Sequence, residues 1–534
     1  MIDNLLIRYL ILLVFIAGLQ NCRQVKDRAM EVVHAVETDP SVDTLSGMAD
    51  RLILFTPQYG KVPAVRRWGA LAVIEDGIVS RMNDPIENVP PGGWVILGMG
   101  EAAEWMNRNL YPGVKFRLDG DSVYADRSSE SKLGQIQYLL DLPYGTPTTR
   151  FHDEAERVLR AYQSNRQDVL LDSAYALARD YQFSGGLPYF GIHGAYWNIV
   201  DQDSAAMRQS VIEMVGSGIQ VVFPHVIYDG YAIYPEAHPD LTQNPQFTGW
   251  DPLEFLMKLS GQYPISFVPW VEVYSIGSAA SPLAIEKAGW LARSRTGNPG
   301  NVSEPDSRFF CPSEPDSRFF CPSEPAVDAF WIEVYQLMER RYGIRAILLD
   351  YLHYPESDSW QQDFCYCDRC SRNFKKEFGV EPIAVTPEDT TMWSNWNTYR
   401  IQQVNRMIRH IHETFPQWRI GVDILPDKGV SLSSRKQDWP YWNERGWIQA
   451  LFPMDWTADT GVVRIQAHGM QDYSRSGTLT MPVVAPYLHY DAMTLLQQID
   501  VISSERLDGF VVYEWGSLTP EMKRALKIGP FRYY

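Results

Sequence analysis

Acidic side chains stand at the ends of several short apolar runs in the second half of the sequence, and they are its best candidates for chemistry. Asp350 follows four apolar residues, and Asp423, Asp455 and Glu514 end similar runs. An acid among apolar neighbours is costly to desolvate unless it pairs or meets a polar ligand. In glycoside hydrolysis one carboxylic acid protonates the leaving oxygen, while a carboxylate attacks the sugar or activates water. We therefore predict Asp350 as the essential carboxylate, with Asp455 preferred as its partner and Glu514 and Glu272 as competitors.

A structural interpretation stands beside this catalytic one. An Asp at the junction of a strand and a loop often caps the loop through backbone N–H groups, and the other acids could hold a neighbouring side chain in place. Aromatic rings are frequent near the same run ends, and their flat faces suit sugars as well as protein cores. The predicted substrate-binding residues are Trp197, His225, Trp270, Glu272, Tyr274, His353, Tyr354, Trp456 and Trp515.

Cysteines form a second cluster of reactive residues. Cys365, Cys367 and Cys370 lie within six residues, at the head of a predicted helix. Three thiols so close together can converge on one ion but rarely all find disulfide partners, and a fourth thiol would complete a tetrahedral zinc site. This local pattern resembles the zinc site beside the barrel of some bacterial β-galactosidases. The alternative is two disulfides, which an oxidising compartment permits.

The fourth thiol is offered by a ten-residue unit, SEPDSRFFCP, that occurs twice in succession over residues 303–322. The two copies carry Cys311 and Cys321. Because a predicted helix begins near Pro325, distance along the chain favours Cys321 as the ligand. The surplus copy is then a tolerated insertion, since doubling the length of a loop costs only ~0.6 kcal/mol.

The elements that must position these residues alternate between short apolar strands and amphipathic helices beyond Pro188. One predicted helix, Trp396 to Phe415, carries apolar residues three and four positions apart, which builds one buried stripe. Eight β–α units in succession predict a (β/α)₈ TIM-like barrel over residues 186–534, with its active site at the carboxyl ends of the strands. The eight predicted strands are YFGIHGAYW, GIQVVFPHVIY, PISFVPWVEVY, IRAILLDYLHYP, WRIGVDILP, IQALFPMDW, TMPVVAPYLHY and DGFVVYEWG.

The first part of the sequence predicts a separate organisation. Residues 48–128 read as a small β-rich module with one short helix, EAAEWMNRNL, and residues 150–184 read as a helical connector. Residues 1–22 resemble a signal peptide, with an apolar run over residues 9–19 that is short for a membrane span. The residues before Cys22 resemble a loose lipoprotein box. We therefore expect an exported, cell-envelope protein, with Cys22 as a candidate lipid anchor.

Composition narrows the class of partner. The chain has 534 residues with 48 Lys plus Arg against 65 Asp plus Glu, a net charge of -17. A strongly acidic protein repels polyphosphate, so we expect no nucleic-acid partner.

Several segments resemble the family-10-like bacterial glycosyl hydrolases. They are WDPLEFLMKL, PWVEVY, FWIEVYQLMERRYGIRAILLDYLHYP, NTYRIQQVNRMIRHIHETFP, WIQALFPMDWTAD and LDGFVVYEWGSL, and IENVPPGGWVILGMGEAAEWM in the small module is similar to a segment found ahead of such barrels. In the sharpest match, LLDYLHYP, the family's strand-end acid and Tyr-Pro pair fall on Asp350, Tyr354 and Pro355. The sequence departs from the family pattern at Arg345-Ala346, Tyr351 and Glu272.

The resemblance implies an exported glycoside hydrolase that acts on a polysaccharide, with cell-wall glycan among the plausible substrates and no cofactor for catalysis. The alternative function is a non-catalytic glycan-binding or envelope scaffold protein that keeps the aromatic cleft. An esterase is disfavoured, because the sequence has no Gly-x-Ser-x-Gly elbow.

Overall fold

The computed structural model of the chain divides into two compact units, residues 1–142 with 150–179, and residues 143–149 with 180–534. The predicted leader, Cys22 and Cys311 lie outside the described residues. Within the described part, no helix combines the length and the apolar character needed to cross a membrane. The structure describes residues 30–34, 52–57, 62, 69–83, 86, 88–99, 101–110, 112–119, 122–126, 129–298, 317–357, 359–488 and 491–533.

The first unit is built on a closed β barrel with strand order β1-β2-β5-β3-β4-β6-β7. The helix α2 (Glu101–Asn109) follows β5, and its Trp105 and Met106 share one core with Leu54 and Ile96. Three further helices follow, α3 (Ser129–Asp141), α4 (Thr149–Asn165) and α5 (Asp168–Phe183). The strands are β1 (Met30–His34), β2 (Leu52–Phe55), β3 (Gly69–Glu75), β4 (Ile78–Met82), β5 (Trp94–Met99), β6 (Lys115–Asp119) and β7 (Ser122–Asp126).

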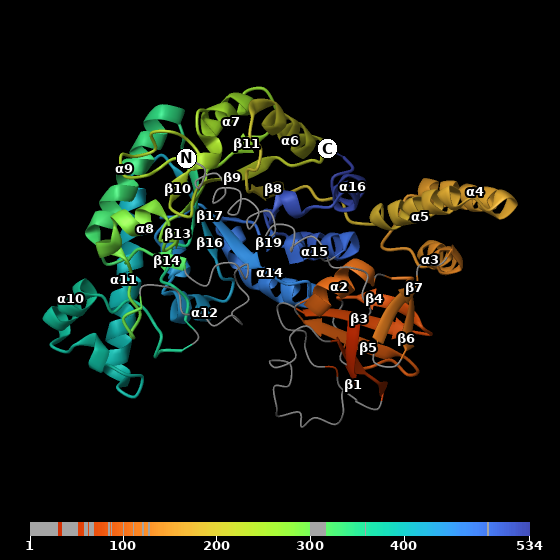
Figure 1. The fold of residues 1–534 in the computed structure, drawn as a ribbon, viewed down its shortest axis with the longest axis horizontal. Helices are drawn as coiled ribbons and strands as arrows, with labels where there is room; N and C mark the ends of the chain where they lie inside the picture. Colours follow the sequence, from red (N-terminus) through yellow and green to blue (C-terminus); the bar gives the residue numbers. More distant parts are fainter. Residues whose placement is uncertain are drawn as a thin grey trace, which may run out of the picture. The chain divides into compact units, whose positions relative to one another are not determined.

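The second unit is a closed barrel of parallel strands, as the sequence predicts (Figure 1). Each of the eight predicted strands supplies one strand position of the barrel. Pairing of β20 with β8 and of β8 with β9 closes the ring. The third and seventh barrel strands are each split into two short segments. In the third, β11 (Ser266–Phe267) precedes β12, and in the seventh, β18 (Leu479–Thr480) precedes β19. In ring order the strands are β8 (Ile192–Trp197), β9 (Val221–Tyr228), β12 (Trp270–Glu272), β15 (Ala346–Asp350), β16 (Arg419–Ile424), β17 (Ala450–Asp455), β19 (Val483–Val484) and β20 (Gly509–Val512).

A helix follows each strand and covers the outside of this barrel. Most begin at an Asp, Ser or Thr whose side chain accepts a backbone N–H of the first turn, as Asp203, Asp251 and Asp459 do. The predicted helix over Trp396–Phe415 is present but starts earlier, at Thr390. The helices are α6 (Ser204–Gly216), α7 (Pro252–Ser260), α9 (Pro325–Tyr342), α11 (Thr390–Thr414), α13 (Trp439–Glu444), α14 (Thr460–Arg475), α15 (Ala492–Ser504) and α16 (Pro520–Ile528).

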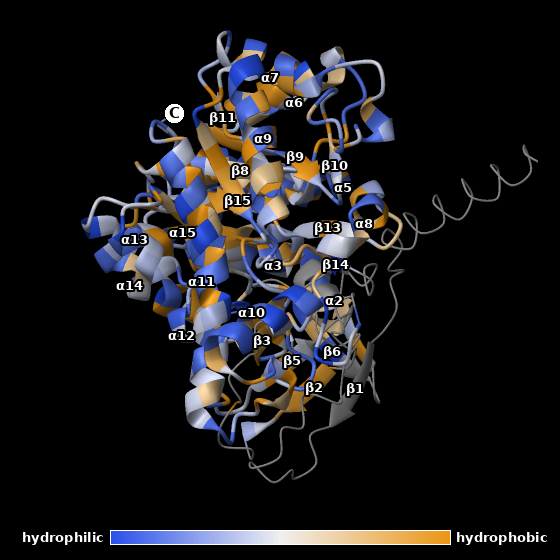
Figure 2. Cartoon of the chain, turned by 90° about the vertical axis from the view of Figure 1, so that its left-hand side faces the viewer, coloured by the Kyte–Doolittle hydropathy of each residue, from blue (hydrophilic) through white to orange (hydrophobic). Residues whose placement is uncertain are grey.

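Two apolar layers hold the barrel together. Side chains that point inward, such as Phe223, Leu348 and Phe452, fill its interior, while their neighbours along each strand pack outward against the helices. In Figure 2 the strands β8, β9 and β15 are largely orange, whereas blue residues gather on helices such as α11. The alternation of side chains along each strand therefore decides which residues face the barrel interior and its mouth.

Candidate active site

Polar side chains stand at the carboxyl ends of six consecutive strands around the ring. Glu272 is directly in register with Asp350, and Asp423 lies one residue beyond the register pair Leu349–Val422, so three acids stand side by side on β12, β15 and β16. Because all these strands are parallel, their carboxyl ends meet at one rim of the barrel. We call the set the polar arc; in ring order its members are Glu514, Asn198, His225, Glu272, Asp350 and Asp423.

Asp350 is the best-positioned acid of the arc. Its Oδ2 accepts a hydrogen bond from Trp270 Nε1 at 3.2 Å, and its Oδ1 accepts one from the backbone N–H of Tyr351 at 2.6 Å. Burial raises the pKa of Asp350 to about 6, while these two N–H donors and the nearby Arg435 oppose the shift. The carboxyl is therefore ionised at neutral pH but gains a proton only slightly below it.

Asp423 lies deeper than Asp350 and is 3% exposed. The hydroxyl of Tyr196 donates a hydrogen bond to its Oδ1. Burial and the neighbouring charge of Asp350 hold the pKa of Asp423 well above its usual range. Burial and the charge of Asp350 thus both favour the protonated form of Asp423.

Glu514 stands on the opposite side of the mouth from Asp350, because β20 and β15 are four strands apart in a ring of eight. Its Oε2 accepts the backbone N–H of Asn198 at 3.2 Å, and the Asn198 side chain makes a second hydrogen bond to it. Burial raises the pKa of Glu514, and both hydrogen bonds counter part of that rise. The charges of Glu514 and of Asp350 both raise the pKa of Tyr513, after burial, so Tyr513 is within electrostatic reach of both acids.

Aromatic rings gather around Tyr513. Its ring lies 4.7 Å from that of Trp456, 5.6 Å from Tyr487 and 6.0 Å from Trp270, measured between centroids. Trp270 in turn stacks on the ring of His225 at 3.4 Å, with the planes 7° apart. The structure thus brings together Trp270, Glu272, His225 and Trp456 from the predicted binding set.

Five other predicted binding residues lie away from the arc. Trp197, Tyr274 and Trp515 belong to the outer core between the strands and the helices. Alternation along the strand explains Trp197, since its neighbour Tyr196 occupies the inward position. His353 is buried with Nδ1 against the backbone carbonyl of Tyr354, and burial lowers its pKa to about 3. The Tyr354 ring is also fully buried, and its hydroxyl lies 3.4 Å from Ser323 Oγ.

The predicted partner acid Asp455 ends β17, where it pairs with Val484 of β19. Its side chain lies outside the described part of the structure. The assignment of Asp455 as the second carboxylate therefore stays a prediction.

Arg435 lies close enough to two acids of the arc to affect their pKa values, and the sequence does not single it out. It ends the π-helical turn Ser431–Arg435, forms an ion pair with Glu356, and lowers the pKa of both Asp350 and Asp423. A single Arg in a loop carries no pattern that would link it to strands earlier in the chain, so no sequence signal could have found it.

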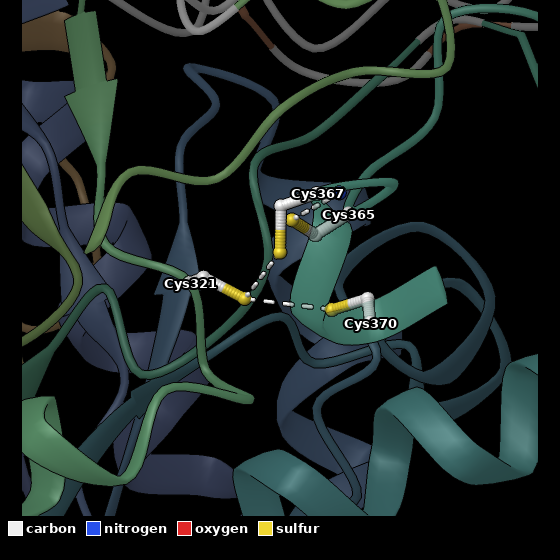
Figure 3. A group of neighbouring side chains, drawn as sticks. All are labelled: Cys321, Cys365, Cys367 and Cys370. Carbon is white, nitrogen blue, oxygen red and sulfur yellow. Dashed lines mark hydrogen bonds between the residues drawn. The ribbon is translucent and has the colours of Figure 1, made fainter. Parts of the chain in front are cut away.

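The four predicted cysteine ligands converge beside the barrel (Figure 3). The Sγ atom of Cys321, from the segment before α9, lies 3.7 Å from that of Cys367 and 3.5 Å from that of Cys370, and all four sulfurs lie within 4.8 Å of one another. Cys367 caps the helix α10 (Asp368–Phe378), which carries Cys370. All four are free thiols.

These separations fit a tetrahedral zinc site. With Zn–S bonds of about 2.3 Å, the edge of the tetrahedron is about 3.8 Å, close to the two distances from Cys321. Cys365 Sγ also accepts backbone N–H groups from Arg293 at 3.2 Å and from Cys367 at 3.5 Å, which would stabilise a thiolate. The donor set thus fits one zinc ion, and the free thiols are not paired as disulfides.

Two solved structures of bacterial enzymes are distantly similar to the chain. The catalytic domain of a beta-amylase from Paenibacillus polymyxa matches at 10% identity over 63% of this chain and 95% of its own, with a TM-score of 0.43. A beta-galactosidase from Bacillus circulans sp. alkalophilus matches at 13% identity over 64% of this chain and 56% of its own, with a TM-score of 0.42. These likenesses are too distant to inform the chemistry of this site.

No curated protein matches the chain. The family model described as glycosyl hydrolase-like 10 matches residues 195–470, slightly more than half of the sequence. This range contains five of the six residues of the polar arc and the complete cysteine cluster. The chain belongs to the glycosyl hydrolase-like 10 family.

Proposed function

We propose that the protein is a glycoside hydrolase that acts on an oligosaccharide or polysaccharide. The scissile glycosidic bond would lie between the carboxyl groups of Asp350 and Glu514. One observation carries the proposal: two acids with raised pKa values stand on opposite strands of the barrel mouth, and the charges of both raise the pKa of Tyr513. Two carboxyl groups that flank the scissile bond are what glycoside hydrolysis requires.

The surroundings of the two acids suggest a role for each. Burial raises the pKa of both acids and two hydrogen bonds oppose it in each, but only Asp350 also has the cation Arg435 favouring its anion. That difference suits Asp350 to attack the sugar or activate water. Burial favours the protonated form of Glu514, which suits a group that gives its proton to the leaving oxygen. The bond from the sugar carbon to that oxygen then breaks, and the oxygen keeps the bonding electron pair and takes the proton.

Half-buried rings offer a platform for the sugar. Trp456, Tyr487 and Tyr513 are each partly exposed and in mutual contact, whereas Trp270 is almost fully buried and supports them. Stacking of apolar sugar faces on such rings would orient the ring between the two carboxyls.

Two variants test the assignment of roles. We expect Asp350→Asn to lose about 10²–10⁴-fold in turnover on every substrate. Glu514→Gln should lose a similar factor on natural glycans but much less on aryl glycosides, whose leaving groups need no proton. New reducing ends from a panel of bacterial and plant glycans, together with release of nitrophenol, supply the measurements.

A glycan-binding protein without catalysis gives a different result. Wild type would then release no reducing ends from any glycan, while binding to one of them would still depend on Trp456. That outcome rejects the hydrolase and supports the scaffold alternative.

We further propose one structural zinc ion held by Cys321, Cys365, Cys367 and Cys370. Its position in the loops around the fourth strand suits a role in folding, because all four positions are filled by protein and none is left open for substrate. We also propose export, on the basis of the apolar run at residues 9–19 and of Cys22. Mass spectrometry of the processed protein would show whether Cys22 becomes a lipid-modified N-terminus.

A further inference from the structure

His225 lies within the polar arc and is in contact with two aromatic rings. Trp270 stacks on one face at 3.4 Å, and the ring of Tyr228 lies 4.6 Å away. The ring edges meet two polar partners, with Nδ1 at 3.0 Å from Asn198 Oδ1 and Nε2 at 3.5 Å from Glu272 Oε1. Burial lowers the pKa of His225 well below its usual value, so the ring is neutral at neutral pH and only one nitrogen carries a proton.

The partners decide which nitrogen that is. The amide oxygen of Asn198 can only accept, so His225 Nδ1 must carry the proton that joins them. His225 Nε2 is then an acceptor, and it is buried without a hydrogen-bond partner, with Glu272 Oε1 3.5 Å away. Because an unsatisfied buried acceptor is costly, a proton on Glu272 would supply the missing hydrogen bond. The other carboxyl oxygen, Oε2, accepts the N–H of Asp229 at 3.2 Å, which leaves Oε1 to carry the proton.

The hydrogen bonds keep the same donor-to-acceptor direction on the other side of Asn198. Because its oxygen is turned toward His225, its Nδ2 donates the side-chain hydrogen bond to Glu514. We infer that Glu272, His225 and Asn198 are positioning residues that form a one-way hydrogen-bond chain, from the protonated Glu272 through the Nδ1–H tautomer of His225 to Glu514. This inference rests on the proposed function only in giving Glu514 the role of proton donor.

The chain has two consequences for the site. It fixes the orientation of the Glu514 carboxyl, since each donor in the chain is held by the one before it. It also keeps Glu272 neutral, so that Asp350 does not face a second negative charge from the in-register position on β12. Other titratable groups packed near the chain are Tyr228 and Asp229 on the β9 side, and burial raises the pKa of both.

Two substitutions of Glu272 separate positioning from catalysis. Glu272→Gln keeps an N–H donor for His225 Nε2 and cannot ionise, whereas Glu272→Leu removes the donor. We expect Glu272→Leu to lose about tenfold to a hundredfold in kcat, because it orphans a buried acceptor. Glu272→Gln should recover most of that loss and should broaden the pH profile on its basic side. If Glu272→Gln is as inactive as Glu514→Gln, Glu272 is itself a catalytic acid and the inference is overturned.

A spectroscopic measurement tests the hydrogen-bond chain without any substrate. In the full-length protein, ¹⁵N resonances of histidine rings report which nitrogen is protonated, and the spectrum of a His225→Gln variant identifies the signal. His193, which lies near the amino end of β8 and contacts the carbonyls of Gly218 and Tyr189, supplies the matched buried control through His193→Gln.

We expect the Nδ1–H tautomer of His225 in wild type, in Glu272→Gln and in Glu272→Leu, because Asn198 accepts from Nδ1 in all three. The ¹⁵N shift of Nε2 should change only in Glu272→Leu, where that nitrogen loses its donor. An Nε2–H tautomer, or a doubly protonated ring at neutral pH, would reverse the chain and reject it. If no glycan is hydrolysed, the proposed function fails, but these spectra still decide whether the chain exists.

Discussion

The raised pKa of Asp350 has a measurable cost in stability, which the variant Asp350→Asn removes. Raising the pKa of a carboxyl from 3.8 to about 6 costs the folded protein about 3 kcal/mol once the group is ionised, since each pKa unit corresponds to about 1.36 kcal/mol. Below pH about 3 the carboxyl is protonated in the folded and unfolded chains alike, and the cost is absent.

The sign of the pH dependence follows from proton binding. Between pH about 4 and about 6 the folded protein holds a proton on Asp350 that the unfolded chain releases, so stability falls as the pH rises. Above about 6 the full cost remains. Asparagine has no such titration, although it gives up one of the two acceptor oxygens that Trp270 and Tyr351 use, at about 1 kcal/mol.

The assay is urea unfolding of wild type and Asp350→Asn at a series of pH values, followed by tryptophan fluorescence of the barrel transition. We expect the variant to be less stable than wild type by about 0.5 kcal/mol at pH 4 and more stable by about 2 kcal/mol at pH 7.5. Asp240→Asn, at an exposed ion pair with Lys287, is the control and should show no such crossover. A free-energy difference that stays constant from pH 4 to pH 7.5 would show that Asp350 is not perturbed and would refute the reasoning.

The remaining predictions concern the cysteine cluster and the mouth. Cys321→Ser should lose the bound zinc, measured by metal analysis and a thiol count, whereas Cys311→Ser should keep it; equal zinc in both would exclude Cys321 as a ligand. Deletion of residues 303–312 leaves one copy of the repeat and should retain both zinc and activity, and loss of either would give the surplus copy a role. Tyr196→Phe should cost about 1–3 kcal/mol in urea unfolding because Asp423 loses its donor, and a neutral result would argue against the hydrogen bond. Trp456→Ala should raise KM more than it lowers kcat, and an unchanged KM would remove it from the sugar platform.

The barrel was predictable because its signals are local. Each strand is a short apolar run, and most of the helices that follow begin at an Asp, Ser or Thr cap that can be read from the sequence. Asp350 was predictable for the same reason, since it ends one such run. The position of Cys321 beside the other thiols also followed from a local distance, its closeness to the start of α9.

The interactions within the site depend on information that is not local. A run of apolar residues does not reveal which of two neighbours points inward, so Trp197 drew attention although Tyr196 faces the interior. Asn198 reaches Glu514 only because the first and last strands pair when the ring closes. No pattern in either segment predicts that Asn198 lies next to Glu514. Asn198 was therefore not among the residues predicted for the site.

The strand β15 is apolar on both faces, with Ile347 and Leu349 turned outward and Leu348 inward. A shift of the strand by one residue would still bury hydrophobic side chains on both sides. Hydrophobic burial alone therefore does not fix its register with the neighbouring strands. Only Asp350 would be misplaced, because it would leave the indole and amide donors that hold it. The residue proposed for the chemistry is thus also the one that keeps its own strand from slipping.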